Sequence, residues 1–303
     1  MVETYDHTGA PVAHHRLRVN GIRMHVIVGG SGPAIVLLHG TPKNSFYWHK
    51  LFPLLTPHFS VVAPDLRGFG FTDKPPAAEG YDCRTNADDI ADLMTQLGHE
   101  HFFVHGEDRG AEYAYALAAA YRDRVTKLSF CEMLLSGLGL EESSFLTQEN
   151  ATRQFRKQGV WCWHLTLFAL PGVPEFLVRG REREFWAFFM KQECYNPDLI
   201  TDEMLDYWTD CITQPGGLTG CFDTYRSVFK NAEINKETAK QKLTCPVMTI
   251  GAPEFFGPQV EENMRLVAEN VAQSEIFDEC GHSLALEKPE RLAGSLRGFM
   301  LGT

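Results

Sequence analysis

The amino-acid sequence predicts an α/β fold in which helices cover both faces of a mostly parallel central sheet and a helical insertion interrupts the chain. From residue 14 to residue 131, short β-branched runs alternate with helical patterns, as in parallel sheets with crossover helices. After Glu132 the strand patterns vanish for about a hundred residues, and Trp, Phe, Arg and Glu dominate between prolines. The alternation then resumes near residue 245. We therefore expect core segments at 1–133 and 236–303 and a helical cap at 134–235.

The first elements can be placed in order along the chain. Runs 16–19 and 24–28 predict a hairpin, because Asn20-Gly21 between them is a strong turn pair. The apolar run 34–38 predicts a fully buried strand, and three further runs predict central strands at 61–63, 102–104 and 127–131. Helical spacing predicts helices at 85–97 and 110–121. Beyond the insertion, we expect strands at 245–250 and 275–277 and a closing helix at 289–300.

Composition limits the class of function. The chain has 303 residues, 44% of them hydrophobic, and a net charge of −11 with no basic run to oppose it. This argues against nucleic acid or an anionic membrane surface as the partner and favours a neutral or apolar small molecule. The eight cysteines form no C-x-x-C pair, so neither a disulfide framework nor a zinc site is expected. The first residues lack a signal-peptide pattern and no apolar run reaches membrane-spanning length, which predicts a soluble, cytoplasmic protein. We expect a monomer or a homodimer.

A candidate nucleophile lies between the strand at 102–104 and the helix at 110–121. The run Gly-Glu-Asp-Arg-Gly at 106–110 has the strand–turn–helix context of a nucleophile elbow, with Asp108 where hydrolases usually have serine. The alternative is that Asp108 only caps the helix. No G-x-S-x-G run occurs anywhere in the chain. A carboxylate that attacks saturated carbon forms an ester that water can hydrolyse, so epoxides and alkyl halides are the plausible electrophiles.

The second step of such a reaction needs a base. His282 follows the last predicted strand, in the chain order nucleophile then histidine. A carboxylate must orient this imidazole, and Glu132 and Glu254 each follow a predicted strand, so the pattern leaves both open.

The run His-Gly-Thr-Pro at 39–42 ends another central strand. It predicts an oxyanion hole made by the backbone N–H groups of Thr41 and Arg109. We expect His39 to be structural, although it is also a candidate for substrate binding together with Arg109 and Trp163. The bond between Thr41 and Pro42 is a candidate cis peptide.

These residues make the chain resemble the epoxide hydrolase and fluoroacetate dehalogenase branch of the α/β-hydrolases, from about residue 20 to the C-terminus. Besides 39–42, 106–110 and 281–282, the resemblance lies in Asp-Leu-Arg-Gly-Phe-Gly at 65–70, Trp-His at 163–164, Pro-Glu at 174–175 and Phe-Asp-Thr-Tyr-Arg at 222–226. It implies an α/β-hydrolase fold with an inserted helical cap, and it ranks Glu132 ahead of Glu254 as the acid.

The resemblance also implies that His164 and Tyr225 donate hydrogen bonds to the oxygen of an epoxide ring. The alternative is that both are packing residues of the cap. Fluoroacetate enzymes carry arginine one and four residues after the nucleophile, whereas this chain has Arg109 and Glu112. Glutamate at 112 would repel a haloacid carboxylate or neutralise Arg109 by pairing with it. Arg109 also replaces the tryptophan that usually follows the nucleophile in haloalkane dehalogenases.

The leading hypothesis is therefore hydrolysis of a fairly apolar epoxide to a vicinal diol, by chemistry that requires no cofactor and no metal. A haloacid dehalogenase and a non-catalytic ligand receptor on the same fold are the alternatives. Aromatic residues of the cap are candidates for the substrate wall, although most aromatic residues at helical spacing serve packing: Phe155, Trp161, Trp163, Phe168, Phe185, Trp186, Phe188, Phe189, Tyr207 and Trp208.

Overall fold

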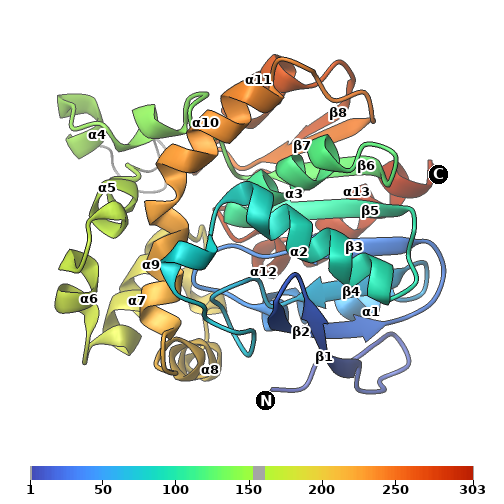
Figure 1. Ribbon diagram of the computed structural model, residues 1–303, viewed down its shortest axis with the longest axis horizontal. Coiled ribbons are helices and arrows are strands. Elements are labelled where there is room, and N and C mark those ends of the chain that lie inside the picture. The colour runs from blue at the N-terminus through green and yellow to red at the C-terminus, as the bar shows by residue number, and fades with distance from the viewer. Residues whose placement is uncertain (1, 153–160, 303) are drawn as a thin grey trace.

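The computed structural model describes residues 2–152 and 161–302 (Figure 1). Within them, eight strands form one sheet in the order β1-β2-β4-β3-β5-β6-β7-β8. Of these strands, β2 runs antiparallel to both of its neighbours, and the pairs from β4 to β8 are parallel. The mostly parallel sheet is confirmed. The strands are β1 (Ala13–Val19), β2 (Ile22–Gly29), β3 (Ala34–Leu38), β4 (Ser60–Pro64), β5 (Phe102–Glu107), β6 (Val125–Cys131), β7 (Val247–Gly251) and β8 (Val271–Ile276).

The hairpin at the sheet edge follows from its turn residues. Asn20 and Gly21 both have positive φ, 40° and 87°, as a type I′ turn requires, and Val19 pairs with Ile22 across them. At the centre of the sheet, all five residues of β3 are buried because helices cover both faces. Strand β8 begins four residues before the predicted start. It is an edge strand with alternating exposure. Because it contains polar residues such as Gln273 and Ser274, it has no apolar run that would predict a strand.

Helices cover the sheet on both sides (Figure 1). One face carries α2 (Cys83–Gln96), α3 (Arg109–Ala120) and α11 (Gln259–Val267), and the other carries α1 (Phe52–Leu55) and α13 (Pro289–Leu301). The predicted helices at 85–97, 110–121 and 289–300 therefore exist, with ends that differ by one or two residues. In the described ranges, no helix is long and apolar enough to cross a membrane.

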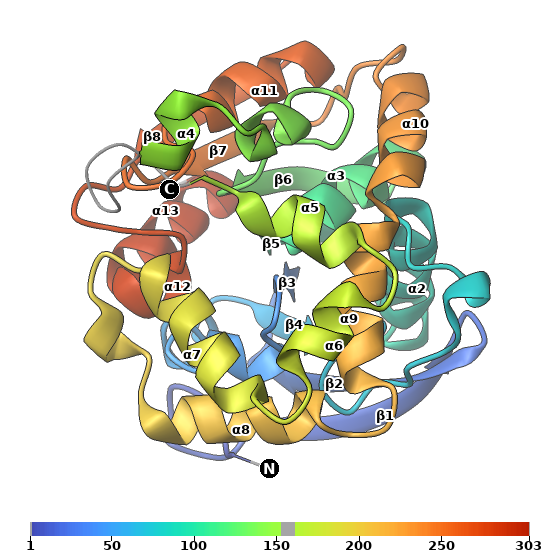
Figure 2. The ribbon, with the colours of Figure 1, turned by 90° about the vertical axis from the view of Figure 1, so that its left-hand side faces the viewer.

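In its described residues, the segment between β6 and β7 consists of helices and the turns and loops that join them, with no strand of the sheet. It contains α4 (Gln148–Thr152), α5 (Trp163–Ala169), α6 (Val173–Val178), α7 (Glu182–Gln192), α8 (Asp202–Ile212), α9 (Gly217–Arg226) and α10 (Val228–Thr238). Figure 2 shows that α5 to α9 surround the carboxyl end of β3. Arg226 of α9 pairs with Glu175 of α6 at 2.8 Å, which joins two of the recognised motifs. The domain boundaries at 133/134 and 235/236 stay a prediction.

Candidate active site

Asp108 occupies the sharp turn between β5 and α3. Its φ of 55° and ψ of −135° are strained for a residue with a side chain. The neighbouring glycines permit this turn: a Cβ at Gly106 would lie 2.3 Å from the Gly110 carbonyl oxygen, and one at Gly110 would lie 2.0 Å from that of Leu38. In the described structure the Asp108 carboxylate makes no capping bond to α3, which leaves the helix-cap interpretation without support.

The carboxylate of Asp108 is buried and held from two sides. The Thr41 backbone N–H donates to its Oδ2 at 3.0 Å, and His282 Nε2 lies 3.6 Å from the same oxygen. Burial alone would raise the pKa of Asp108, but the ion pair with His282 and the positive charges of Lys43 and Arg109 hold it well below its usual value. The carboxylate is thus ionised at every physiological pH. The Thr41–Pro42 peptide bond is cis.

The imidazole of His282 lies between two carboxylates. Its Nδ1 is 3.4 Å from Glu132 Oε2, and its ring stacks on Phe255 with centroids 4.0 Å apart. Burial lowers the pKa of His282, yet Asp108 and Glu132 outweigh it and raise the pKa to about 10. The resting imidazole is therefore protonated.

Glu132, rather than Glu254, is the acid beside His282. Glu132 is fully buried at the end of β6, and its other oxygen accepts from the Ala252 N–H at 2.6 Å. Burial raises the pKa of Glu132 despite the neighbouring imidazolium. Glu254 is partly exposed and makes no hydrogen bond to His282 in the described structure.

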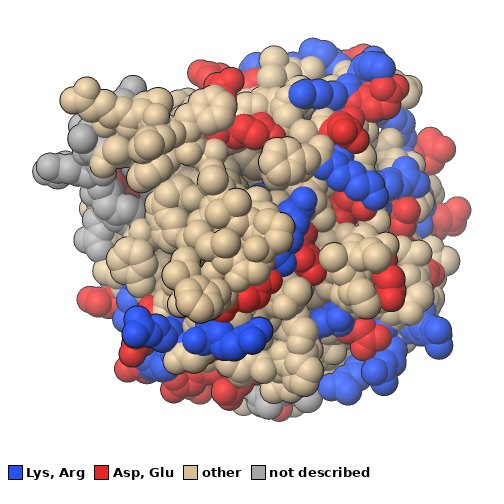
Figure 3. All heavy atoms as spheres, turned by 60° about the vertical axis from the view of Figure 1, so that its left-hand side comes forward, with Lys and Arg blue, Asp and Glu red and all other residues tan. Residues whose placement is uncertain are grey.

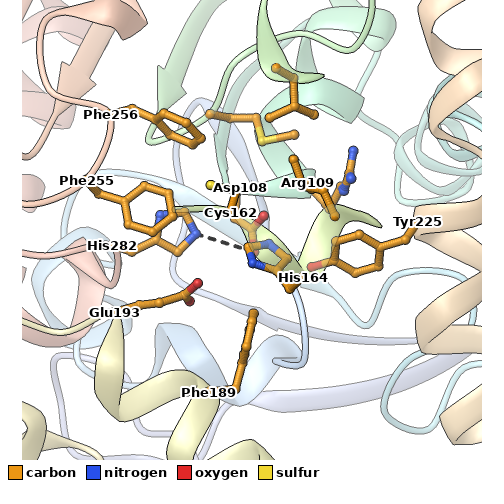
Figure 4. A pocket seen from close by; sticks show the side chains of 13 residues that line it. Asp108, Arg109, Cys162, His164, Phe189, Glu193, Tyr225, Phe255, Phe256 and His282 are labelled. Carbon is orange, nitrogen blue, oxygen red and sulfur yellow. Dashed lines mark ion pairs between the residues drawn. The ribbon is translucent and has the colours of Figure 1, made fainter. Parts of the chain in front are cut away.

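His164 of α5 and Tyr225 of α9 face Asp108 across a cavity (Figure 4). Their ring centroids are 5.8 Å apart and nearly perpendicular. Burial lowers the pKa of His164 to about 3, so the ring is neutral, and burial raises the pKa of Tyr225 well above its usual value. The guanidinium of Arg109 lies 4.7 Å from the centre of the Tyr225 ring. Both side chains also pack on Phe168, so the packing role and the cavity-facing position coexist.

The cavity is small and mixes apolar walls with ionisable groups. Its polar lining consists of Asp108, Arg109, His164, Glu193, Tyr225 and His282, and its apolar lining of Met133, Leu140, Cys162, Leu165, Phe189, Phe255 and Phe256. Enclosure by apolar walls with a few convergent polar groups is typical of a small-molecule site.

Arg109 is paired inside the protein. Its Nη1 donates to Glu112 Oε2 at 3.0 Å, which is one of the two effects of Glu112 that the residue pattern left open. Glu112 also accepts from the Ser136 backbone N–H at 3.0 Å and from the amides of Asn231 and Asn235 at 2.9 and 2.8 Å. The charge of Arg109 is therefore largely balanced before any substrate arrives.

A comparison with protein families now adds to this geometry. A family model described as the alpha/beta hydrolase fold matches residues 33–289. The chain belongs to the α/β-hydrolase fold family. The match spans the helical segment and most of the predicted core residues on either side of it.

Individual relatives place this α/β-hydrolase in a branch. The chain is 31% identical to the soluble epoxide hydrolase of Corynebacterium sp. (strain C12), over 92% of this chain and 94% of the relative. It is 34% identical to a fluoroacetate dehalogenase of Burkholderia sp, over 93% of this chain and 91% of the relative. Among solved structures, wild-type Cfl2 from Burkholderia cenocepacia superposes with a TM-score of 0.88 at 31% identity, covering 98% of this chain and 99% of that one. The chain is a hydrolase of the branch that includes these epoxide hydrolases and fluoroacetate dehalogenases.

Two residues predicted to bind substrate lie outside the cavity lining of this hydrolase. His39 is fully buried, its Nδ1 lies 2.9 Å from the Gly40 carbonyl oxygen, and its Nε2 accepts from the Leu66 N–H at 3.0 Å. Trp163 is half-buried and packs against His164, but it lines a separate apolar groove. Leu140 and Leu165 border both the groove and the cavity. Figure 3 shows mostly uncharged side chains on the part of the surface formed by the helical segment.

The aromatic residues of the helical segment divide clearly. Of the predicted wall residues that the structure describes, Phe189 lines the cavity, whereas Phe168, Trp186 and Trp208 are buried packing residues and Phe188 is exposed. Phe155 lies outside the described residues. Sequence reasoning missed Glu193, Phe255 and Phe256. The Phe pair after β7 could have been noticed as an apolar pair next to the candidate acid Glu254, but Glu193 resembles an ordinary surface residue at the end of a helix.

Proposed function

We propose that this hydrolase opens an epoxide to a vicinal diol through a covalent ester on Asp108. The observation that carries the proposal is the arrangement of three groups around one cavity: an ionised carboxylate, two facing donors on α5 and α9, and an imidazole–carboxylate pair beside the nucleophile. Each half of the proposed reaction uses a different part of this arrangement.

In the first half, one oxygen of Asp108 attacks a ring carbon and the bond from that carbon to the ring oxygen breaks. The negative charge that appears on the ring oxygen is stabilised by hydrogen bonds from His164 and Tyr225. Tyr225 transfers its proton to this oxygen. His164, with its pKa near 3, acts as a neutral N–H donor and does not supply a proton. The Arg109 guanidinium over the Tyr225 ring stabilises the tyrosinate that forms.

In the second half, water attacks the ester carbonyl carbon and His282 accepts its proton. Alkylation makes this possible because it removes the negative charge of Asp108, one of the carboxylates that keep the resting imidazole protonated. The pKa of His282 falls, the imidazolium releases its proton, and this proton converts the tyrosinate back to Tyr225. Hydrogen bonds from the backbone N–H groups of Thr41 and Arg109 stabilise the tetrahedral oxyanion. Collapse breaks the bond between the acyl carbon and the diol oxygen, and His282 returns a proton to that oxygen. The proton of the new Asp108 carboxyl group then passes to His282, which restores the resting carboxylate and imidazolium.

The test separates ester formation from ester hydrolysis. With an epoxide such as styrene oxide, Asp108→Asn should lose diol formation by about a thousandfold or more. The surface control Asp123→Asn should keep wild-type activity, because residue 123 is exposed in the turn before β6. Full activity of Asp108→Asn would end the proposal.

In His282→Gln the ester should form but persist, and intact-mass analysis should detect an adduct of one substrate on the peptide that contains Asp108. In a single wild-type turnover in heavy-oxygen water, the label should enter the Asp108 carboxylate and not the diol. Label found directly in the diol would mean that water attacks the epoxide itself.

A haloacid dehalogenase is the second candidate, because a relative of similar length is named a fluoroacetate dehalogenase and Arg109 Nη2 has no partner in the described structure. Halide release from fluoroacetate or chloroacetate, measured beside diol formation, decides between the two. The Arg109–Glu112 pair favours the epoxide, since a substrate carboxylate would have to approach a glutamate. A ligand receptor would bind epoxides without turnover. Cytoplasmic location and a monomeric or homodimeric state remain predictions.

A further inference from the structure

Glu193 is a third carboxyl group on the catalytic cavity, and the reaction proposed above does not use it. It follows the last residue of α7, is 5% exposed, and lines the cavity together with Asp108 and His282 (Figure 4). In the described structure its carboxyl group has no hydrogen-bond or ion-pair partner. The other buried acidic side chains described all have partners: Asp65, Asp82, Asp89, Glu107, Asp108, Glu112, Glu132, Glu175 and Asp223.

The position of Glu193 is fixed by the loop that carries the base. The His282 backbone N–H donates to the Glu193 carbonyl oxygen at 2.8 Å. The same oxygen would lie 2.3 Å from a Cβ at Gly281, so only glycine allows this approach. The end of α7 is therefore locked against the catalytic loop, and the Glu193 side chain keeps its place relative to His282.

A largely buried carboxyl group that opens only onto a cavity makes fewer hydrogen bonds to water than it does in solution, and here no protein donor replaces them. Burial raises the pKa of Glu193 to about 7; the charges that act on it are His282 and Lys43, which lower its pKa, and Asp108 and Glu132, which raise it. Charges of both signs therefore surround the Glu193 carboxyl group. Whether it is protonated or ionised, it has an oxygen that can accept a hydrogen bond. This suits a neutral hydrogen-bond donor better than a permanent cation.

We propose that Glu193 accepts a hydrogen bond from a hydroxyl group of the substrate, so that the hydrolase prefers small epoxides with a hydroxyl on the carbon next to the ring. The inference rests on the epoxide hydrolysis proposed above. The cavity is small, which favours a compact molecule, and Glu193 supplies an acceptor on its wall that Asp108, committed to attack, cannot. The preference opposes the apolar walls, which by themselves would favour an alkyl group over a hydroxyl.

Three small epoxides test the preference: glycidol and 1,2-epoxybutane are nearly equal in shape, and glycidyl methyl ether is longer by one methyl group. Glycidol carries the hydroxyl, 1,2-epoxybutane replaces it with a methyl group, and glycidyl methyl ether keeps the oxygen but cannot donate. The wild-type kcat/KM for glycidol should exceed that for 1,2-epoxybutane by roughly tenfold or more, the range of a hydrogen bond to an ionised acceptor. Glycidyl methyl ether should behave like 1,2-epoxybutane.

Variants assign the preference to Glu193. Glu193→Gln keeps the shape and a weaker acceptor, so the glycidol preference should fall to a few-fold. Glu193→Met removes the acceptor, and the preference should disappear or reverse. The control Glu184→Gln removes an exposed carboxylate from the same helix and should keep the wild-type ratio. Because Glu193→Gln is isosteric, its ratio decides the question even if the methionine variant does not fold.

The outcomes separate this inference from the function on which it rests. Diol from all three epoxides with no glycidol preference, or a preference that keeps its wild-type size in Glu193→Gln and Glu193→Met, would overturn the hydroxyl site alone. An equal loss of kcat for all three epoxides in Glu193→Gln would overturn it too. That result would mean that Glu193 acts on His282 rather than on the substrate hydroxyl. No diol from any of the three would overturn the epoxide assignment, and the inference with it.

Discussion

Two carboxyl groups on the same cavity wall have opposite pKa shifts, and the partners of each explain the difference. Asp108 has a backbone donor and an imidazolium beside it, so its pKa is held far below normal. Glu193 is buried without such partners, and its pKa rises to about 7. One acid is therefore ready to attack carbon, whereas the other can accept a hydrogen bond in either protonation state.

The pKa of Glu193 has a consequence for stability. The folded protein holds a proton on Glu193 that the unfolded chain releases between about pH 4.5 and pH 7. The free energy of unfolding contributed by this group therefore falls as pH rises through that window. Glutamine cannot ionise, so Glu193→Gln should gain stability relative to wild type as pH rises, by roughly 3 kcal/mol at most. Urea unfolding at pH 5 and pH 8 measures this, and an equal difference at both pH values would contradict it.

Glu132 and Glu254 make a matched pair for testing the acid beside His282. Glu132→Gln removes a charge that raises the pKa of His282, so ester hydrolysis should slow and kcat should fall by roughly a hundredfold or more, with ester accumulating. Glu254→Gln should keep the wild-type kcat. Quenched samples analysed by intact mass follow the ester. A slow Glu254→Gln with a normal Glu132→Gln would reverse the assignment.

At the scale of elements, a buried polar cluster ties α10 to the nucleophile helix. Asn235 of α10 donates to Glu112 of α3 at 2.8 Å and to the Ser136 carbonyl oxygen at 3.0 Å. The same glutamate holds the guanidinium of Arg109. A substitution in α10 should therefore change how Glu112 holds Arg109, the residue next to the nucleophile.

Asn235→Leu measures how much this cluster contributes. It keeps the number and branching of the side-chain heavy atoms but leaves the buried Glu112 carboxylate with one partner fewer, so we expect a loss of about 1–3 kcal/mol of unfolding free energy. The control Asn270→Ala changes an exposed side chain before β8 and should stay within about 0.5 kcal/mol of wild type. A neutral Asn235→Leu in urea unfolding at pH 7 would show that the cluster is dispensable.

Elements with strong local signals could be predicted, and those without them could not. The hairpin was predictable because Asn20-Gly21 demands one turn type, and β3 because its whole length is apolar and covered on both faces. Strand β8 was misplaced because an edge strand needs few apolar residues. In the helical segment, the sequence predicted helices but not their arrangement, which depends on side-chain packing between distant segments.

For the whole molecule, the candidate site could be predicted where the fold itself brings residues together. Asp108, Glu132 and His282 each follow a strand of a mostly parallel sheet, so their approach is a consequence of topology. His164 and Tyr225 came from the family resemblance. Glu193 had no signal in the sequence, because its place on the cavity depends on how the end of α7 packs against the loop around Gly281.

That contact between Glu193 and Gly281 limits how new specificities could arise on this scaffold. If recombination replaced the whole helical segment with that of a relative, the incoming backbone would have to bring a carbonyl oxygen to the same point above Gly281. Otherwise the backbone N–H of His282, in the loop that carries the base, would lose its hydrogen-bond acceptor. Point substitutions on α5, α7 and α9 avoid this requirement. We therefore expect descendants of this chain to diversify by single residues of the cavity wall more readily than by exchange of the segment as a module.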